Sequence, residues 1–323
     1  MRRYLHCVSW LVLSLATATP GATQTYPTKP VRLVVPYAPG GIADIAARIV
    51  GAKLTEAWGQ QVVVENKPGG NATIGMSTVA HAAPDGYSLL VATSGDFELS
   101  PQLLKDMPYD VARDFAPITS LTDTPTFLGA NVDAPYKTLA DVIADAKAKP
   151  GKIPIASPGT GSMQQLHFEW MASAAGIKLQ HIPSKGGAPA AAAVAAGDVP
   201  IGLLAVASTM AYLKNGRVRV LAQMPATRSS FIPDVPTMKE SGLSDVDGTN
   251  WTMLMAPKAT PQPIIDKVHA ETVRVLALPD VIERFKGAAA VTIPTTPADL
   301  ARRIARETEA VKVIIAKTGM TSD

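Results

Sequence analysis

The sequence predicts an α/β protein whose sheets are mainly parallel. Short runs of β-branched and apolar residues alternate along the chain with segments that have the hydrophobic periodicity of helices. A strand, a glycine-containing loop and a helix follow one another in this order three times. The chain has 323 residues, 47% of them hydrophobic, which is enough for two compact domains or one large domain.

The first part of the chain starts this alternation. Val31–Val35 is predicted to be a strand and Ile42–Trp58 a helix, because apolar residues recur on one helical face. Gly59 can end that helix. The other elements expected here are strands at 61–66 and 85–94 and a helix near 76–82.

The second part repeats the pattern. The sequence predicts a helix over 162–174 that ends at Gly176, and another that begins at Pro189 and ends at Gly197. A final helix has Thr296 as its N-cap, Pro297 as its first residue and Asp299 as a charge that favours its N-terminus. The other elements expected here are strands at 152–157, 178–184, 218–223 and 250–257, a short helix at 238–241 and a helix at 261–278.

The first two dozen residues have the pattern of a secretory signal peptide. Arg2 and Arg3 form a basic start, residues 5–18 are predominantly apolar, and small residues follow around Ala22. The apolar stretch is shorter than the roughly 20 residues that span a bilayer. We therefore predict a signal peptide at residues 1–24, cleaved on export to the periplasm.

Export limits the chemistry of the mature chain. The only cysteine is Cys7, inside the predicted signal peptide, so the mature chain has no disulfide, no thiol nucleophile and no cysteine for lipidation or metal binding. Without Arg2 and Arg3, the mature chain has 28 basic residues against 27 acidic ones. No long basic run interleaved with aromatic residues is present, so nucleic acid is not an expected partner.

Three strand–loop–helix junctions point to a bound anion. Their sequences are PYAPGG at 36–41, SPGTGS at 157–162 and SKGG at 184–187. Glycine lets the backbone approach a ligand, and each following helix begins with unpaired N–H groups. The first and third junctions are far apart in sequence, so we expect them in different domains that face one cleft. A simple turn is the alternative interpretation for any one of these loops.

These loops suit a carboxylate better than a polyphosphate. The chain lacks a phosphate-binding loop that ends in Gly-Lys-Ser/Thr, and Gln164 stands where a dinucleotide-binding loop has its third glycine. The first two loops contain no cation. Asp44 either forms a surface ion pair with Arg48 or accepts hydrogen bonds from waters that bridge to the ligand. The hydroxyl groups near these junctions belong to Thr93, Ser94, Ser157, Thr160 and Ser162.

No catalytic or metal site is predicted. Ser162, His167 and Glu169 could suggest a hydrolase, but His167 falls on an apolar helical stripe, which is typical of a histidine in the core. No Gly-x-Ser-x-Gly motif accompanies these residues, and no His-Glu-x-x-His pair is present. We therefore expect no enzyme activity, no cofactor and no metal.

Six stretches together resemble one known family. They are YPTKPVRLVVPYAPGGIADIAAR, VENKPGGNATIG, APDGYSLLVATSG, ASPGTGSMQQLHFE, IPSKGGAPA and FIPDVPTMKESG. From Tyr26 to near the C-terminus, the chain resembles the Bug family of periplasmic solute-binding proteins, the receptors of tripartite tricarboxylate transporters. The combination is specific, although each motif alone is weak.

The resemblance implies a fold and a site. The fold is a two-domain clamshell like the type II periplasmic binding proteins, with crossing strands at the hinge and a ligand cleft between the domains. Domain I is expected at 25–122 plus 246–323, and domain II at 123–245. In the family, the Pro-Gly-Gly-x-x-Asp loop holds a ligand carboxylate largely through backbone N–H groups and two bridging waters. The residues expected at the ligand are Tyr37, Pro39, Gly40, Gly41, Ala43, Asp44, Thr93, Ser94, Ser157, Thr160, Gly161, Ser162, Ser184, Lys185, Gly186 and Leu204.

The sequence departs from the family pattern in two places. Ser184 stands where the third loop often has a tyrosine, and Leu204 and Ala205 stand where many members have an acidic residue. An ammonium group in a desolvated cleft needs a negative partner. The expected ligand is therefore a mono- or dicarboxylate with an apolar or aromatic body and no amine. Phe127 and Trp251 are candidates for an aromatic wall, with core packing as the alternative.

These observations predict a periplasmic receptor, expected to be monomeric. It would capture a small organic carboxylate and deliver it to the membrane components of a tripartite tricarboxylate-type transporter. The alternative is a carboxylate-sensing receptor of the same fold that acts in signalling. A hydrolase that uses Ser162 is a third, weaker interpretation.

Overall fold

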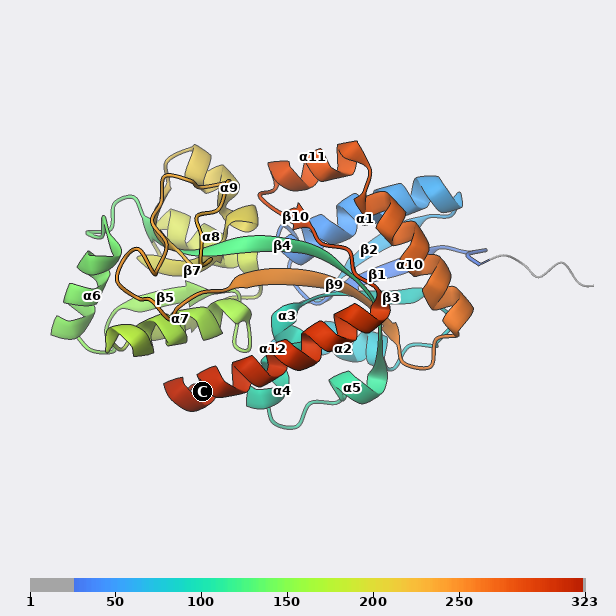
Figure 1. The fold of residues 1–323 in the computed structure, drawn as a ribbon, viewed down its shortest axis with the longest axis horizontal. Helices are drawn as coiled ribbons and strands as arrows, with labels where there is room; N and C mark the ends of the chain where they lie inside the picture. The colour runs from blue at the N-terminus through green and yellow to red at the C-terminus, as the bar shows by residue number, and fades with distance from the viewer. Residues whose placement is uncertain (1–25, 322–323) are drawn as a thin grey trace, which may run out of the picture.

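Two long strands, β4 (Phe115–Asn131) and β9 (Thr249–Pro257), run side by side through the middle of the molecule (Figure 1). The structure is a computed structural model that describes residues 26–321. The predicted signal peptide therefore lies outside the described residues. β4 and β9 connect two groups of strands in one continuous sheet, whose order is β2-β1-β3-β9-β4-β7-β5-β6.

The first lobe is built on β1 (Val31–Val35), β2 (Val62–Asn66) and β3 (Ser88–Thr93). These strands are parallel to one another, whereas β9 is antiparallel to both β3 and β4. One face of this sheet is covered by α1 (Ile42–Trp58), α10 (Gln262–Leu276) and α11 (Pro279–Gly287). The other face is covered by α2 (Thr73–Ala80), α3 (Ser94–Glu98) and α12 (Pro297–Thr318).

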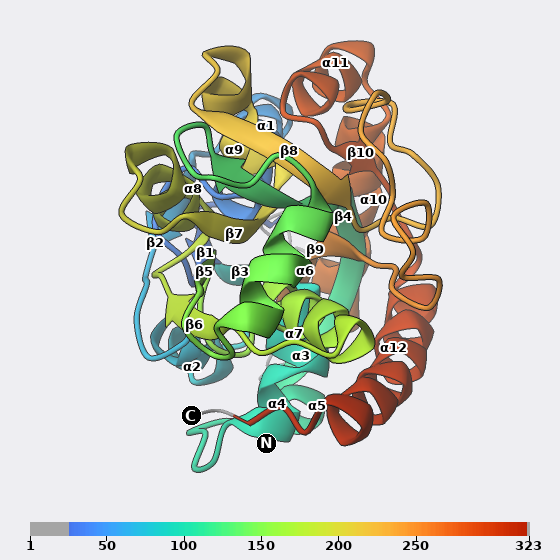
Figure 2. The same cartoon turned by 90° about the vertical axis from the view of Figure 1, so that its left-hand side faces the viewer.

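The second lobe repeats this design on β5 (Pro154–Ser157), β6 (Gln180–Pro183) and β7 (Ile201–Ala205). These strands are parallel, and β4 is antiparallel to β7 and to β8 (Val218–Gln223). Two helices, α6 (Leu139–Ala148) and α7 (Met163–Ala175), cover one face. Two others, α8 (Gly187–Ala196) and α9 (Val206–Lys214), cover the opposite face. Figure 2 shows this lobe in front.

Three short elements complete the fold. They are α4 (Ser100–Leu103), α5 (Val111–Asp114) and the two-residue strand β10 (Val291–Thr292), which pairs with β4. The long helix α12 extends from the first lobe onto α7 of the second (Figure 1). A small apolar cluster joins the two, with Val311 of α12 beside Met163 and Leu166 of α7 and Leu99 of the first lobe. Within residues 26–321, no helix combines the length and the apolar character that crossing a bilayer requires.

Several predicted elements are confirmed. The first strand and the first helix have the predicted bounds, and Gly59 ends that helix in the left-handed conformation with φ of 63°. Thr296 caps the last helix and accepts a hydrogen bond from the backbone N–H of Asp299. Gly176 and Gly197 end their helices in the same left-handed conformation. The α/β class is therefore confirmed.

Other expectations need correction. The sheet is mixed, because the central strands β4 and β9 are antiparallel to their neighbours. Residues 238–241 form turns and no helix. The helix expected to begin at Pro189 begins at Gly187, the helix expected at 261–278 ends at Leu276, and α11 is a further helix that was not predicted. The expected domain boundary at 122/123 falls inside β4, and the domain division stays a prediction.

Candidate ligand-binding site

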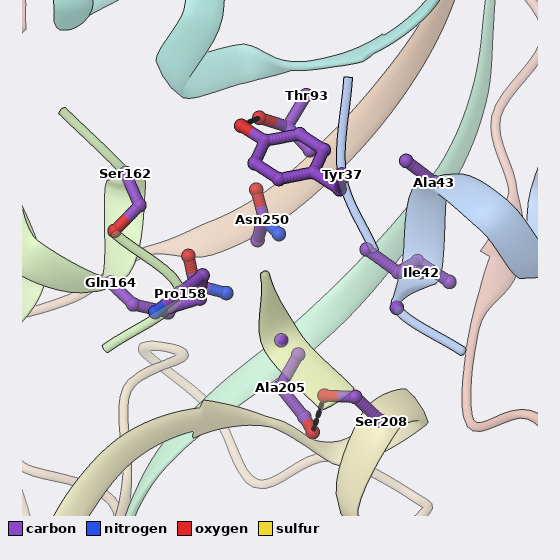
Figure 3. Close-up of a pocket in the computed structure, with 12 residues that line it drawn as sticks. Tyr37, Ile42, Ala43, Thr93, Pro158, Ser162, Gln164, Ala205, Ser208 and Asn250 are labelled. Atoms are coloured by element: carbon purple, nitrogen blue, oxygen red, sulfur yellow. Dashed lines mark hydrogen bonds between the residues drawn. The ribbon is translucent and has the colours of Figure 1, made fainter. Parts of the chain in front are cut away.

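Five helices begin around one small cavity between the lobes (Figure 3). α1 contributes its start at Gly41, and α3 contributes its N-cap Thr93. From the second lobe, α7 contributes its N-cap Ser162, α8 its first residue Gly187, and α9 its N-cap Ala205. The cavity has a volume of about 30 Å³. Its lining residues are Tyr37, Gly41, Ile42, Ala43, Thr93, Pro158, Ser162, Gln164, Gly187, Ala205, Ser208 and Asn250.

The helix ends at this cavity leave backbone donors free. Gly41, Gly186 and Ala205 are the N-caps of α1, α8 and α9, and none of them accepts a side-chain cap bond from its helix. The first N–H groups of a helix have no partner within the helix, and their dipoles favour negative charge. None of the lining residues is charged. An anion in this cavity would therefore meet backbone dipoles and no charged side chain of the lining.

A second cavity of about 220 Å³ adjoins the first. The two share Tyr37, Pro158 and Ser162 as lining residues. The second cavity also has one cation, Lys185, and one acid, Asp96, in its lining. Its remaining lining residues are Pro36, Gly69, Gly70, Asn71, Ala72, Ser100, Gly159, Thr160, Pro183 and Ser184.

Asp44 fixes the conformation of the first loop. Its carboxylate accepts hydrogen bonds from the backbone N–H of Gly40 at 2.9 Å and from the Asn66 side chain at 3.0 Å. Arg48 binds the same carboxylate, with 2.8 Å between Nη2 and Oδ1. Burial raises the pKa of Asp44, but the hydrogen bonds from Arg48, Gly40 and Asn66 outweigh it, so the pKa lies below its usual 3.8. Gly40 has a φ of +89°, which glycine adopts without the steric cost that a residue with a Cβ would have.

Tyr37 and Thr93 form a buried network at the boundary between the cavities (Figure 3). The Tyr37 hydroxyl donates to Asp96 Oδ1 at 2.6 Å and lies 3.1 Å from Thr93 Oγ1. The other oxygen of Asp96 accepts the backbone N–H of Thr93 at 2.8 Å. Burial raises the pKa of Asp96 to about 6, although these hydrogen bonds oppose the shift. The network fixes the Tyr37 ring in the wall of both cavities.

The second loop is held by side chains of its own lobe. Ser162 Oγ donates to the carbonyl oxygen of Gly159 at 2.6 Å and accepts from the N–H of Gln165, the third residue of α7. The N–H of Gly161 donates to the Gln165 side-chain oxygen at 2.8 Å. Ser157 Oγ lies 2.6 Å from His181 Nε2. Within residues 26–321, the Ser162 hydroxyl makes these bonds and none to a histidine that could act as a base.

The loops of the two lobes touch each other. The N–H of Ala38 donates to the carbonyl oxygen of Lys185 at 3.1 Å. Ser100 Oγ donates to the carbonyl oxygen of Gly161 at 3.2 Å. These bonds cross from the first lobe to the second, so the structure holds the lobes together around the cavities.

The residues expected at the ligand fall into two groups. Those that line a cavity are Tyr37, Gly41, Ala43, Thr93, Thr160, Ser162, Ser184 and Lys185. Those that line neither cavity are Pro39, Gly40, Asp44, Ser94, Ser157, Gly161, Gly186 and Leu204. Most residues of the second group make hydrogen bonds that hold the loops in place. Gly186, for example, donates its N–H to the carbonyl oxygen of Pro158.

Leu204 does not lie where the sequence predicted. It is fully buried in an apolar cluster with Phe127 and residues of α8. Successive side chains of a strand point to opposite faces, so the next residue, Ala205, takes the position at the cavity wall. The cavity wall at this point is therefore a small apolar residue, still without an acidic group.

Sequence reasoning missed three polar residues of the first cavity. They are Gln164 of α7, Ser208 of α9 and Asn250 of β9. Only Asn250 had a visible signal, because a polar residue begins an otherwise apolar strand. His167, in contrast, is confirmed as a core histidine: it is buried with Nδ1 3.1 Å from Thr126 Oγ1, and burial lowers its pKa to about 4. Phe127 and Trp251 are core residues that line neither cavity.

Comparisons with known proteins agree with this architecture. A family model described as tripartite tricarboxylate transporter family receptor matches residues 46–320. The structure of the periplasmic binding protein BugD is 33% identical and has a TM-score of 0.86, with 92% of this chain and 99% of that chain covered. This similarity identifies the fold as that of a periplasmic binding protein.

Two further solved structures contain small acids. The Rpa4515 protein of R. palustris with adipate is 28% identical, with a TM-score of 0.88 over 92% of this chain and 99% of that one. MatC from Rhodopseudomonas palustris with bound malate is 29% identical, with a TM-score of 0.86 over 90% of this chain and all of that one. Both ligands are carboxylates.

Proposed function

The chain belongs to the tripartite tricarboxylate transporter receptor family, and on this premise we propose that it captures a small organic carboxylate in the periplasm and delivers it to the membrane components of such a transporter. The single observation that carries the proposal is the uncharged cavity at which five helices begin, three of them without a side-chain cap. Carboxylates are the ligands that such an arrangement suits. The adipate and malate of the two similar structures support the same class of ligand.

The ligand-binding residues follow from this proposal. One carboxylate group lies in the first cavity and accepts hydrogen bonds from the first N–H groups of α1, α8 and α9. The body of the acid extends past Tyr37 into the second cavity. A second carboxylate at the far end of the acid would meet Lys185, so a dicarboxylate uses both cavities.

Capture requires the lobes to separate and close. We place the hinge in β4 and β9, because these strands pair with neighbours in both lobes or lead directly between them. The acid, bound between the lobes, favours the closed arrangement because it contacts loops from both. No bond in the ligand changes in this function.

A thermal-shift screen of the mature protein tests the proposal. Each acid is paired with its neutral amide, for example adipate with adipamide and succinate with succinamide. An acid at 100 times its dissociation constant adds about 2.7 kcal/mol to the free energy of unfolding, which raises Tm by several degrees. The amides should have no effect. A panel in which acids and amides act alike would contradict a carboxylate site.

The role of Lys185 needs a matched pair of variants. Lys185→Gln should weaken binding of dicarboxylates about tenfold and leave monocarboxylates unchanged, since only a second carboxylate reaches the second cavity. Lys178→Gln, an exposed lysine of the same lobe, is the control and should bind both as the wild type does. Equal losses for mono- and dicarboxylates would contradict a contact between Lys185 and a second carboxylate, and unchanged affinity for both would place Lys185 outside the ligand contacts.

A gene deletion distinguishes delivery to a transporter from sensing in a signalling pathway. A strain that lacks this receptor should lose uptake of the radiolabelled acid identified in the screen, and the uptake should return with the wild-type gene. Normal uptake together with a lost transcriptional response to the acid would favour the signalling receptor predicted as the alternative.

A further inference from the structure

Asn66, the last residue of β2, holds the backbone of the first loop although it lines neither cavity. Its side-chain nitrogen donates one hydrogen bond of 3.0 Å to the carbonyl oxygen of Tyr37 and another of 3.0 Å to Asp44 Oδ1. Its side-chain oxygen accepts a hydrogen bond of 3.0 Å from Arg48 Nη2. The nitrogen faces two acceptors and the oxygen faces a donor, so this network fixes the orientation of the amide.

The carbonyl oxygen of Tyr37 belongs to the same peptide group as the N–H of Ala38. This group is planar and trans, so its C=O and its N–H point in opposite directions. Within residues 26–321, the Tyr37 oxygen has no hydrogen bond other than the one from Asn66. By holding this oxygen, Asn66 sets the direction in which the N–H of Ala38 points.

That N–H makes one of the hydrogen bonds that cross between the lobes, with 3.1 Å between its nitrogen and the carbonyl oxygen of Lys185. The Lys185 oxygen shares a peptide group with the N–H of Gly186, which donates to the carbonyl oxygen of Pro158 at 2.8 Å. Pro158 lines both cavities. Hydrogen bonds in such a row polarise and strengthen one another. The row therefore links Asn66 in the first lobe to the cavity wall in the second.

Regular secondary structure does not fix the peptide group between Tyr37 and Ala38. Residues 36–41 form the loop between β1 and α1, so the group is bound neither by a neighbouring strand nor by a helical turn. A peptide group without such partners can rotate about the single bonds on either side of it. Loss of the Asn66 side chain would therefore let the N–H of Ala38 turn away from the second lobe.

We propose that Asn66 is a positioning residue for closure of the lobes. It orients the peptide group between Tyr37 and Ala38 for the hydrogen bond to Lys185, and so raises the affinity for the acid without touching it. This inference rests on the proposed function, in which the closed lobes enclose the acid.

The test compares two asparagines that end strands. Asn131 is the last residue of β4, and its side-chain nitrogen donates to the carbonyl oxygen of Val194 at 2.8 Å. It is buried and lines neither cavity. Asn131→Leu is therefore the control for Asn66→Leu, because both variants remove an amide that holds backbone of the chain. Asn66→Ala is the substitute if Asn66→Leu is not native by circular dichroism.

Amide hydrogen exchange measured by NMR tests the orientation of the peptide group. The measurement is made on the mature protein, both without acid and with the acid identified in the thermal-shift screen. In Asn66→Leu, the N–H of Ala38 should exchange about tenfold faster than in the wild type. The N–H of Gly40, which Asp44 holds, should exchange within about twofold of its wild-type rate. Asn131→Leu should leave the ratio of the two exchange rates unchanged.

Isothermal titration with the same acid tests the consequence for binding. Asn66→Leu should weaken binding about fivefold, since it removes the support of a hydrogen bond that the closed lobes share. Asn131→Leu should bind the acid as the wild type does, even though it also lowers the free energy of unfolding. Equal loss of affinity in the two variants would overturn the inference, because the effect would then follow stability.

The outcomes separate this inference from the proposed function. If an acid binds and the N–H of Ala38 exchanges equally fast in Asn66→Leu and the wild type, the proposed function stands and the role of Asn66 is wrong. That role is also wrong if the N–H groups of Ala38 and Gly40 exchange faster by the same factor, because the whole loop has then loosened. If no acid binds, the proposed function fails, and the exchange rates measured without acid still decide whether Asn66 orients this peptide group.

Discussion

The backbone N–H of Ala38 donates a hydrogen bond of 3.1 Å to the carbonyl oxygen of Lys185, and so joins the first loop of one lobe to the third loop of the other. The bond involves no side chain. It lies beside the cavities, since Tyr37 and Lys185 both line the second one. Closure of the lobes and the shape of the ligand site are therefore fixed by the same loops.

Gly95 lets the lobes approach each other closely. A Cβ at this position would lie 2.9 Å from the Gly161 carbonyl oxygen and 2.9 Å from the Met163 nitrogen, both in the opposite lobe. Gly95→Ala should hold the lobes apart, weaken acid binding at least tenfold and increase the radius of gyration in solution scattering. Gly287→Ala is the control, because a Cβ there meets nothing within 4 Å. Unchanged affinity in Gly95→Ala would show that the lobes need not close this far.

Asp44 should be essential to the first loop without touching the ligand. Asp44→Asn keeps only one acceptor oxygen, so either Gly40 or Asn66 loses its partner. Hydrogen bonds to charged groups contribute about 1.5–3 kcal/mol, and we expect a loss of that order in urea unfolding together with weaker acid binding. Arg48→Gln, which removes a half-exposed partner, should cost less. Equal losses would mean that the ion pair is the main contribution.

The buried histidines should make the protein unstable in acid. Burial lowers the pKa of His167 to about 4, so its neutral form is favoured in the folded state. The lowered pKa contributes to the free energy of unfolding in full above pH 6.5, and the contribution is lost as the pH falls from 6.5 towards 4. For His167 this contribution amounts to about 3 kcal/mol. His167→Asn should therefore reduce the fall in urea-unfolding free energy between pH 7 and pH 4.5. Burial also lowers the pKa of His181, so part of the pH dependence of the unfolding free energy should remain in this variant. An unchanged slope in His167→Asn would contradict this assignment.

Glu98 should destabilise the protein at high pH. It is fully buried, and neither of its carboxyl oxygens has a hydrogen-bond partner in residues 26–321. Burial raises its pKa well above the usual value and the charge of Glu307 adds to the shift, while Arg303 and Arg306 oppose it. A raised pKa gives stability that is present at low pH and lost as the pH rises through the folded-state pKa.

Glu98→Gln should therefore raise Tm at pH 8 by a few degrees and have less effect at pH 5. The control is Glu309→Gln, an exposed residue of α12 that pairs with Lys312. It should change Tm little at either pH. A glutamine variant that is less stable than the wild type by the same amount at both pH values would rule out the ionised carboxylate as the source of the penalty.

The parts of the fold that could be predicted are those whose signals are local. The helix from Ile42 to Trp58 has its periodicity, its N-terminal loop and its stop at Gly59 within one short stretch. The three loops are also local signals, because a loop of glycines before a helix carries its chemistry in the backbone. These signals were enough to predict an anion site.

The central strand β4 could not be recognised in the same way. Its sequence, FAPITSLTDTPTFLGAN, contains two prolines, an aspartate and a glycine, which are uncommon inside a central strand. The strand is nevertheless buried along most of its length, because elements from both lobes cover it. It changes partners along its course, from β9 in the first lobe to β7 and β8 in the second. Pairing with strands of both lobes is decided by residues that are far from β4 in the sequence, so the local sequence does not reveal it.

The errors at the site have a similar cause. Leu204 and Ala205 are neighbours, and only the register of β7 decides which of them faces the cavity. Asn250 joins Tyr37 and Ala205 only after the chain has folded, since these residues are far apart in sequence. The lining of a cavity between two lobes is a property of tertiary structure.

In the proposed site, backbone N–H groups at the helix N-termini bind the carboxylate, whereas the side chains of the lining determine which acid fits. Backbone N–H groups do not titrate and do not change when a side chain is replaced. On the proposed function, a substitution of a lining side chain such as Ser208 or Lys185 would change which acid is accepted, while the backbone N–H groups would still bind its carboxylate. The same property should make the hold independent of the acidity of the surroundings for as long as the acid itself stays ionised.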